Sequence, residues 1–171
     1  MGSSEIYLKH VCKIVDNLTG SHSSIEKVGP HSEYMIKVFL EILLAPNRAN
    51  NIISQIFNVI INLIKCSCNI GLCNNYIDYV LKTYPSIHNL EHEKRDLFYS
   101  GFLTIAQICL MTIRKSNGSI TMDQLSTLYN LVVEHYKRIN DVDGDGFYLV
   151  SALAFFIPND RRLIDDFWKY I

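Results

Sequence analysis

A short acidic turn near the C-terminal end has the residue types and spacing best suited to chemistry. Asp141, Asp143, Asp145 and Gly146 match the first half of an EF-hand calcium loop. Calcium there takes about six to eight oxygen ligands, and a glutamate that closes the loop supplies two of them. Ala152 stands at that closing position, and the residues around it are typical of a buried helix. We therefore expect no calcium site, and a turn that can also cap the helix that follows it.

A cluster of cysteines is the second candidate site. Cys66, Cys68 and Cys73 are three of the five cysteines in the chain. A structural zinc site needs about four ligands in tetrahedral geometry, and two cysteines separated by one residue chelate poorly. No histidine lies in that segment. The sequence favours free thiols in a connection between helices, and an odd cysteine number suits a reduced cytosolic or nuclear protein.

The chain carries no recognisable catalytic motif. Its six histidines fall mostly on expected loops or exposed faces. Folding could bring a cysteine and a histidine together as a catalytic pair, and that alternative stays open. The sequence has no nucleophile elbow, phosphate loop or pair of carboxylates that would support an enzyme. We expect a protein that is not an enzyme and that holds no cofactor or metal.

Composition and charge narrow the class of protein further. The chain has 171 residues, enough for a single-domain core, and 49% of them are hydrophobic. The 16 basic residues nearly balance the 17 acidic ones, so the chain lacks the basic excess that is typical of nucleic-acid-binding proteins. The apolar run 59–61 is broken at Asn62 and again at Lys65, and no run approaches the roughly 20 residues needed to span a bilayer, so we expect no membrane insertion. Residues 1–4 resemble the remnant of an expression tag, which leaves 5–171 as one segment.

The hydrophobic pattern predicts helices throughout. Apolar residues recur three and four positions apart, and no segment alternates cleanly with period two. We expect a loop over 66–74 centred on Gly71, a helix end at Pro85, and a capping box at Ser119 or Thr121. The expected helices cover about 4–18, 31–44, 50–65, 75–84, 94–115, 121–136, 147–157 and 160–171.

These helices alternate in character. The second, fourth, sixth and eighth are striped and half-exposed, whereas the first, third, fifth and seventh are apolar almost all round. Pairing them gives units of about 40 residues, the spacing of HEAT or armadillo repeats. The pattern predicts an all-α fold, an α-solenoid of about three to four antiparallel helix pairs. A compact helical bundle is the alternative.

The last thirty or so residues carry a family resemblance. Residues 147–154 read Phe-Tyr-Leu-Val-Ser-Ala-Leu-Ala, and residues 167–171 read Phe-Trp-Lys-Tyr-Ile. Both segments are similar to a middle HEAT repeat of importin-β (karyopherin-β). Cys109 with residues 113–115, and residues 48–52 with their Asn50-Asn51 pair, resemble earlier inner helices of that family. The chain departs from it at Lys169, where the family has proline, and in residues 19–30, which lack the family's acidic character.

The resemblance implies a fragment of a nuclear transport receptor in the cytoplasm and nucleus, including the nuclear pore. Its partners would be basic adaptor or cargo segments, the GTPase Ran and FG nucleoporins, and the fragment itself would be monomeric. In the family the second helix of each repeat faces the partner with carboxylates, amides and aromatic rings. The expected partner-binding residues on such helices are Asn51, Gln55, Asn58, Asn62, Asp96, Tyr99, Asp143, Asp145 and Tyr148.

Other interpretations of these residues stay open. The asparagine stripe also fits an ordinary solvated helix edge, and Asp145 also fits a helix cap. The chain as a whole also fits a HEAT scaffold from another karyopherin, or from a complex outside transport such as a phosphatase or translation-factor scaffold. A calcium-responsive helical module is the remaining alternative, and the missing closing glutamate argues against it.

Overall fold

A computed structural model describes residues 3–20, 28–45, 48–67 and 69–139, together with 149, 152–156 and 165. Every regular element in these ranges is a helix, and none of the described residues lies in a strand. The predicted all-α class is confirmed. The chain divides into two compact units, Met1–Asn69 and Ile70–Ile171, and each is described by itself.

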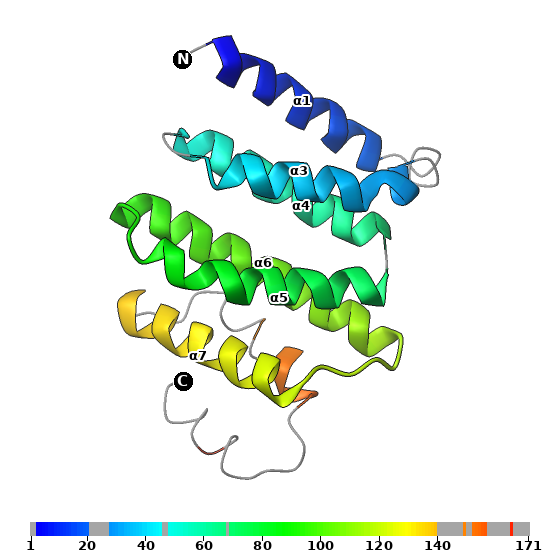
Figure 1. The fold of residues 1–171 in the computed structure, drawn as a ribbon, viewed down its shortest axis with the longest axis vertical. Coiled ribbons are helices and arrows are strands. Elements are labelled where there is room, and N and C mark those ends of the chain that lie inside the picture. Colours follow the sequence, from blue (N-terminus) through cyan, green and yellow to red (C-terminus); the bar gives the residue numbers. More distant parts are fainter. Residues whose placement is uncertain are drawn as a thin grey trace. The chain divides into compact units, whose positions relative to one another are not determined.

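The first unit is built around one helix that packs against the others. It contains α1 (Ser3–Thr19), the 3-10 helix η1 (Gly29–His31), α3 (Ser32–Leu43) and α4 (Asn50–Ser67). A short connection joins α3 to α4, and the two run antiparallel, while α1 packs against α4 (Figure 1). The side chains of α4 that fill this core are Ile52, Ile53, Ile56, Phe57, Val59, Ile60, Leu63 and Ile64.

Helix α1 differs from its predicted character. It was expected to be buried almost all round, but only one side is covered, by way of Leu8, Cys12 and Val15. On another side Tyr7 is 74% exposed and Ile14 is 58% exposed. The reason is that α1 packs mainly against α4, and among the described helices of this unit none covers its second apolar stripe. The helix also begins at Ser3, inside the segment expected to be a tag remnant.

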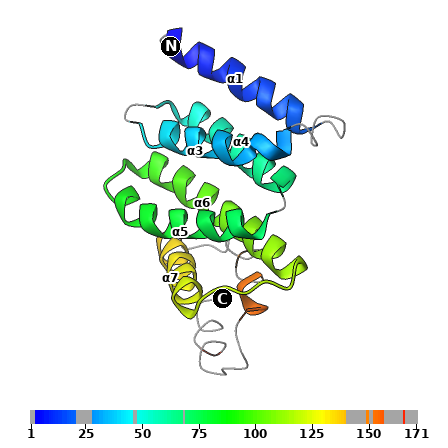
Figure 2. The same ribbon diagram turned by 45° about the vertical axis from the view of Figure 1, so that its right-hand side comes forward.

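The second unit repeats the pairing of two antiparallel helices. It contains α5 (Ile70–Ile87), α6 (His92–Lys115) and α7 (Met122–Ile139). A tight turn over 88–91 joins α5 to α6, and the two lie side by side in both views (Figure 1, Figure 2). Helix α7 packs against α5 and, less extensively, against α6. Phe98 and Phe102 of α6 are buried, with their rings in an edge-to-face contact 5.8 Å apart.

Helix α6 is the one described helix that is long and apolar enough to cross a membrane by length and composition. In that stretch 56% of the residues are buried inside the protein. Helix α6 packs mainly against α5, and a largely buried helix of a protein core has this same length and composition.

The predicted loop over 66–74 and the predicted helix end at Pro85 are wrong. Helix α5 already begins at Ile70 with Gly71 in its first turn, and it continues through Pro85 to Ile87. Cys73 and Ile87, near the two ends of α5, are both almost completely buried. Their burial offsets the roughly 1 kcal/mol cost of a helical glycine. Pro85 lies in the last turn, where few later residues depend on the helix continuing.

The last two predicted helices fall largely outside the described residues. So does the acidic turn at 141–146 that was compared with an EF-hand loop. Within that part of the chain, Leu149, Ala152 and Leu153 are buried, and 152–154 are helical. Beside them the guanidinium of Arg114 lies 3.1 Å from the centre of the Phe155 ring, a cation–π contact.

Candidate binding site between helices α1 and α4

The predicted amide stripe lies on one face of α4. Asn51, Gln55, Asn58 and Asn62 follow one another at intervals of three and four, so they project from the same side of the helix. Asn51 and Asn58 are exposed, whereas Gln55 and Asn62 are half-buried. The opposite side of α4 carries its apolar residues into the core.

Three of the four stripe residues lie beside α1, although Asn58 among them stays exposed to solvent. The side-chain amide of Asn62 donates a hydrogen bond of 2.6 Å to Oδ1 of Asp16 on α1. Gln55 and Asn58 line a cavity together with Lys9 and other residues of α1. The stripe is therefore one wall of a site whose second wall is α1.

The cavity has a volume of about 170 Å³ and is lined by two short helical segments. On α1 its lining residues are spaced so that they share one face. From α4 come two amide side chains and one valine. The lining residues are Lys9, Cys12, Lys13, Asp16, Gln55, Asn58 and Val59.

Gln55, which lines the cavity, has one polar atom without a hydrogen bond. Its Oε1 is buried and has no hydrogen-bond partner. A buried acceptor without a donor costs about 1–3 kcal/mol. Because this oxygen is closed to solvent, it belongs to the packed contact between the helices, and other atoms of Gln55 line the open part of the cavity.

The charges around the cavity are unequal. Lys9 and Lys13 bring two positive charges, one helical turn apart, and Asp16 brings one negative charge. One oxygen of Asp16 is already engaged by Asn62. Burial raises the pKa of the Cys12 thiol, the nearby Asp16 carboxylate adds to the rise, and the thiol is neutral at pH 7. The cavity therefore carries one net positive charge.

Sequence reasoning missed the α1 side of this site. Lys9, Lys13 and Asp16 were not singled out, because no motif marks them. Their spacing of four and three residues was the available signal, since it places them on one side of a helix. Only the packing of α1 on α4 reveals that this side meets the amide stripe.

The predicted residues of α6 separate into two environments. Asp96 is partly exposed and its Oδ2 lies 3.0 Å from Nδ1 of His92, one turn earlier. Tyr99 is completely buried, and its ring makes an edge-to-face contact with the ring of Tyr84 on α5 at 5.7 Å. In this unit Tyr99 therefore belongs to the core and is not on a surface that a partner could reach. Asp143, Asp145 and Tyr148 lie outside the described residues.

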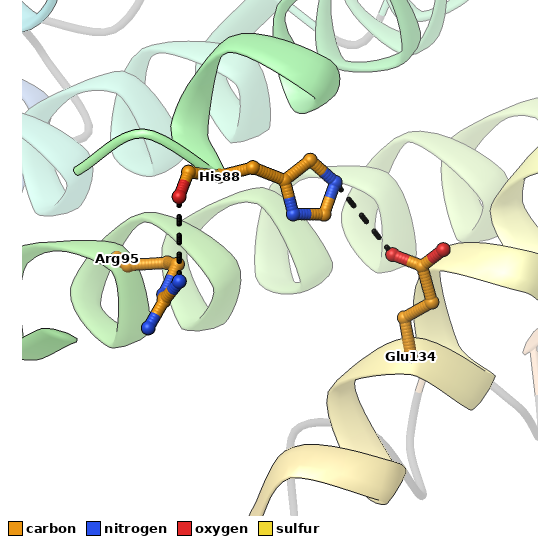
Figure 3. Close-up of polar contacts among 3 residues, drawn as sticks. All are labelled: His88, Arg95 and Glu134. Atoms are coloured by element: carbon orange, nitrogen blue, oxygen red, sulfur yellow. Dashed lines mark hydrogen bonds and ion pairs between the residues drawn. The ribbon is translucent and has the colours of Figure 1, made fainter.

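A second polar arrangement surrounds the turn between α5 and α6 (Figure 3). Nη1 of Arg95 donates a hydrogen bond of 3.3 Å to the backbone carbonyl of His88. The imidazole of His88 points toward Glu134 on α7, with 3.8 Å between Nε2 and Oε2 (Figure 3). Both side chains of this pair are nearly half exposed. The arrangement ties the turn to α6 and α7.

The described cysteines do not form a metal site. No group of three or more histidine, cysteine, aspartate or glutamate side chains in the described ranges is placed to hold a metal ion. The buried thiols of Cys73 on α5 and Cys109 on α6 hydrogen-bond to each other. This bond lowers the pKa of Cys73 and, together with burial, raises that of Cys109 well above its ordinary value. The pair is one more contact within the α5–α6 core.

Comparisons with known proteins add no relative. No family model, no curated protein and no solved structure matches the chain.

Proposed function

We propose that this chain is a helical-repeat scaffold for protein binding, and specifically a HEAT-repeat segment of a nuclear transport receptor of the importin-β type. The observation that carries the proposal is the recurrence of antiparallel helix pairs. α3 pairs with α4 in the first unit, and α5 pairs with α6 in the second. Their first helices begin at Ser32 and Ile70, about 40 residues apart, which is the spacing of HEAT repeats.

The distribution of buried residues between the two helices of each pair supports the same proposal. In both pairs the second helix contributes more buried residues than the first. Helix α4 combines this burial with a narrow polar face, as expected for a helix that lines the binding surface of a solenoid. The importin-β resemblance of residues 147–154 and 167–171 supplies the transport assignment.

On this proposal the partners are basic adaptor or cargo segments, Ran and FG nucleoporins. The protein would work in the cytoplasm and nucleus and pass through the nuclear pore. The acidic turn with Asp143 and Asp145 is the proposed contact for a basic segment, and Tyr148 adds a ring for stacking against arginine or lysine.

A HEAT scaffold of another karyopherin, or of a complex outside transport, is the second candidate. The same helix pairs fit this candidate equally well, because they do not show which partner binds. Departures such as Lys169 also count in its favour.

The test uses the complete protein and an arginine-rich adaptor-type peptide, titrated by calorimetry at two salt concentrations. The triple variant Asp143→Ala, Asp145→Ala, Tyr148→Ala should bind more weakly, and its affinity should depend less on salt. Single carboxylates should contribute a few-fold each, because an exposed ion pair is worth about 0–1 kcal/mol. Glu41→Ala, which removes an exposed carboxylate from α3, serves as the control and should leave binding unchanged.

The outcomes separate the two candidates. Binding of the basic peptide and of GTP-loaded Ran, both lost or weakened as described, supports a transport receptor. A protein that binds neither of them nor FG-repeat peptides would move the assignment to the scaffold outside transport. Unchanged affinity and salt dependence in the triple variant would mean that the acidic turn is only a helix cap.

A further inference from the structure

Two buried cysteines face each other across the α5–α6 pair. Cys73 lies near the start of α5 and Cys109 in the second half of α6, and both residues are 0% exposed. Their thiols hydrogen-bond to each other, and Cys73 is also hydrogen-bonded to Thr112, one turn after Cys109 on α6. Because both partners of Cys73 lie on one face of α6, the side chain of Cys73 points at that face. The packing of the two helices therefore holds the two sulfur atoms next to each other.

The spacing of packed helices suits a disulfide between these positions. Packed helix axes lie about 8–10 Å apart, and Cα atoms lie about 2.3 Å from each axis. Cα atoms that face each other across a helix pair therefore approach to about 3–6 Å, and a disulfide joins Cα atoms about 4.4–6.8 Å apart. The two ranges overlap, so a bond between Cys73 and Cys109 requires no separation or rearrangement of α5 and α6.

The hydrogen bond between the thiols gives them different chemical roles. It lowers the pKa of Cys73 and, together with burial, raises the pKa of Cys109 well above its ordinary value. A lower pKa increases the fraction of thiolate, which is the form of cysteine that reacts with oxidants. Cys73 is therefore the thiol that reacts first, and Cys109 is the protonated neighbour that reacts with the product.

An oxidant reaches Cys73 through the start of α5. The helix begins at Ile70, and the first backbone N–H groups of a helix have no partner within it. Gly71, a poor helix former, lies in this turn and is exposed. Helix ends of this kind open locally at much lower cost than the whole fold. A covalent reaction accumulates over many brief openings, so a thiol that is closed to solvent in the folded state still reacts at this position.

We propose that Cys73 and Cys109 form a reversible disulfide bond when hydrogen peroxide oxidises the protein. The thiolate of Cys73 attacks one peroxide oxygen and the O–O bond breaks, which leaves Cys73 as a sulfenic acid. The other oxygen leaves as hydroxide and takes up the proton that Cys73 lost. The sulfur of Cys109 then attacks the sulfur of Cys73, the S–O bond breaks, and the departing hydroxide takes the proton of Cys109 and becomes water. The two thiols lose two electrons and two protons, the peroxide becomes two water molecules, and a dithiol reductant reverses the bond by thiol–disulfide exchange.

This inference goes beyond the proposed transport function and does not depend on it. It concerns two residues of the second unit and a small oxidant, whereas the transport proposal concerns a protein partner at Asp143 and Asp145. The two can therefore fail separately. The disulfide would close a long loop that contains the turn between α5 and α6, and such a cross-link stabilises the folded state relative to the unfolded chain.

The experiment oxidises the whole reduced chain with a few-fold excess of hydrogen peroxide under native conditions. The remaining thiols are then blocked with iodoacetamide in denaturant, and the disulfides are mapped by proteolysis and mass spectrometry. We expect one cross-linked pair of peptides, which joins Cys73 to Cys109 and disappears after treatment with dithiothreitol. The oxidised protein should also have a higher melting midpoint than the reduced protein. Cys12 is the internal control, because it is 2% exposed but lies in the middle of α1, and it should keep its thiol over the same time.

Variants separate the roles of the two thiols. In Cys109→Ala the sulfenic acid of Cys73 should persist and be captured by dimedone, whereas the natural chain should give much less of this adduct. In Cys73→Ala the thiol of Cys109 should stay reduced. Cys66→Ala is the matched control, since it removes a half-buried thiol from α4, and it should leave the disulfide unchanged. The mapping in the natural chain needs no variant, so it decides the proposal even where an alanine disturbs folding.

Three results would overturn the proposal. The first is that Cys73 and Cys109 keep their thiols while Cys12 or Cys66 is oxidised. The second is a set of disulfides that joins Cys73 to other cysteines as often as to Cys109, as expected of an unfolded chain. The third is conversion of Cys73 to a sulfinic acid without any cross-link, which would show that the sulfur of Cys109 does not reach it.

Discussion

Asn62 of α4 donates a hydrogen bond of 2.6 Å to Asp16 of α1, across 46 residues of sequence. It is a direct link between the side chains of the two helices that enclose the candidate site. The bond holds one oxygen of Asp16, so it also limits how much negative charge that residue presents to the cavity. Stability and binding are therefore expected to be linked at this end of α1.

A double-mutant cycle measures that link. Asn62→Ala and Asp16→Ala are compared with the double variant by urea unfolding. Because the bond is exposed, we expect a coupling free energy of about 0.5–1 kcal/mol, the lower part of the range for a hydrogen bond. Asn62→Ala combined with Glu33→Ala on the exposed face of α3 is the control, and these two should be additive. If the changes in unfolding free energy of the Asn62 and Asp16 variants are additive, this hydrogen bond does not stabilise the α1–α4 contact.

The start of α7 offers a test of capping. The backbone N–H of Gln124 donates to Oγ1 of Thr121 at 3.2 Å, and the N–H of Thr121 donates to Oε1 of Gln124 at 2.9 Å. Gln124 also donates a bond of 2.7 Å to Asp78 on α5. Thr121→Ala should lower the free energy of unfolding by about 1 kcal/mol. Thr121→Ser, which keeps the hydroxyl, should lower the free energy of unfolding much less.

Ser126→Ala is the matched control for this cap. Ser126 is an exposed residue inside the same helix, where alanine is the better helix former, so its replacement should change stability by less than about 0.5 kcal/mol. If Thr121→Ala costs no more than Ser126→Ala, the reciprocal bonds do not stabilise α7.

Features that depend on neighbouring residues were predictable from the sequence. A capping box at Ser119 or Thr121 was expected, and the structure has it at Thr121 with Gln124. The apolar spacing placed α4 within two residues of its observed bounds and put Asn51, Gln55, Asn58 and Asn62 on one face. These follow from the 3.6-residue period and from side chains that reach their own backbone, which need no tertiary information.

Features that depend on tertiary packing were not predictable. Tyr99 was expected on a partner surface, yet its ring is buried against Tyr84 of α5. Gly71 and Pro85 are helix-breaking residues that burial against α6 holds inside α5. The cavity walls come from α1 and α4, and no pattern within either helix shows which side meets the other.

The end of α6 gives the third prediction. Asn117 has φ 54°, and the N–H of Gly118 donates 2.8 Å to the carbonyl of Ile113, which together form a Schellman cap. An L residue in this conformation is strained, and asparagine tolerates it better than most. Asn117→Gly should therefore be neutral or slightly stabilising, whereas Asn117→Ala should cost about 1 kcal/mol in unfolding experiments. Equal stability of the two variants would contradict this assignment.

The neighbouring glycine is required for a different reason. A Cβ on Gly118 would lie 2.9 Å from Cγ2 and 3.2 Å from the carbonyl oxygen of Ile113. Gly118→Ala should destabilise the protein by about 1–3 kcal/mol through this overlap. Gly118→Ala combined with Ile113→Val keeps Cγ2 in place, so it should not recover the loss. Recovery in the double variant would show that Ile113 can move aside.

The buried thiol of Cys12 makes stability depend on pH in the alkaline range. Burial raises its pKa in the folded protein, and Asp16 adds to the rise. The unfolded chain therefore loses the thiol proton first, near its ordinary pKa of about 8.5, while the folded chain keeps it. Because the folded state then binds more protons, stability falls as the pH rises. The contribution is fully present below the unfolded pKa and is lost as the pH approaches the folded value.

Urea unfolding of the reduced protein from pH 7 to pH 10 tests this. Folding also shifts the pKa values of Cys109 (upward) and Cys73 (downward), so the informative quantity is the difference in pH dependence between the natural chain and Cys12→Ala. Cys12→Ala should be less stable at pH 7 because it loses buried volume, and should lose less further stability by pH 10. Val15→Ala removes buried volume from the same side of α1 without an ionisable group, so it should lower stability equally at every pH. Parallel curves for the natural chain and Cys12→Ala would show that the thiol keeps its ordinary pKa, and that the α1–α4 contact does not hold Cys12 away from water.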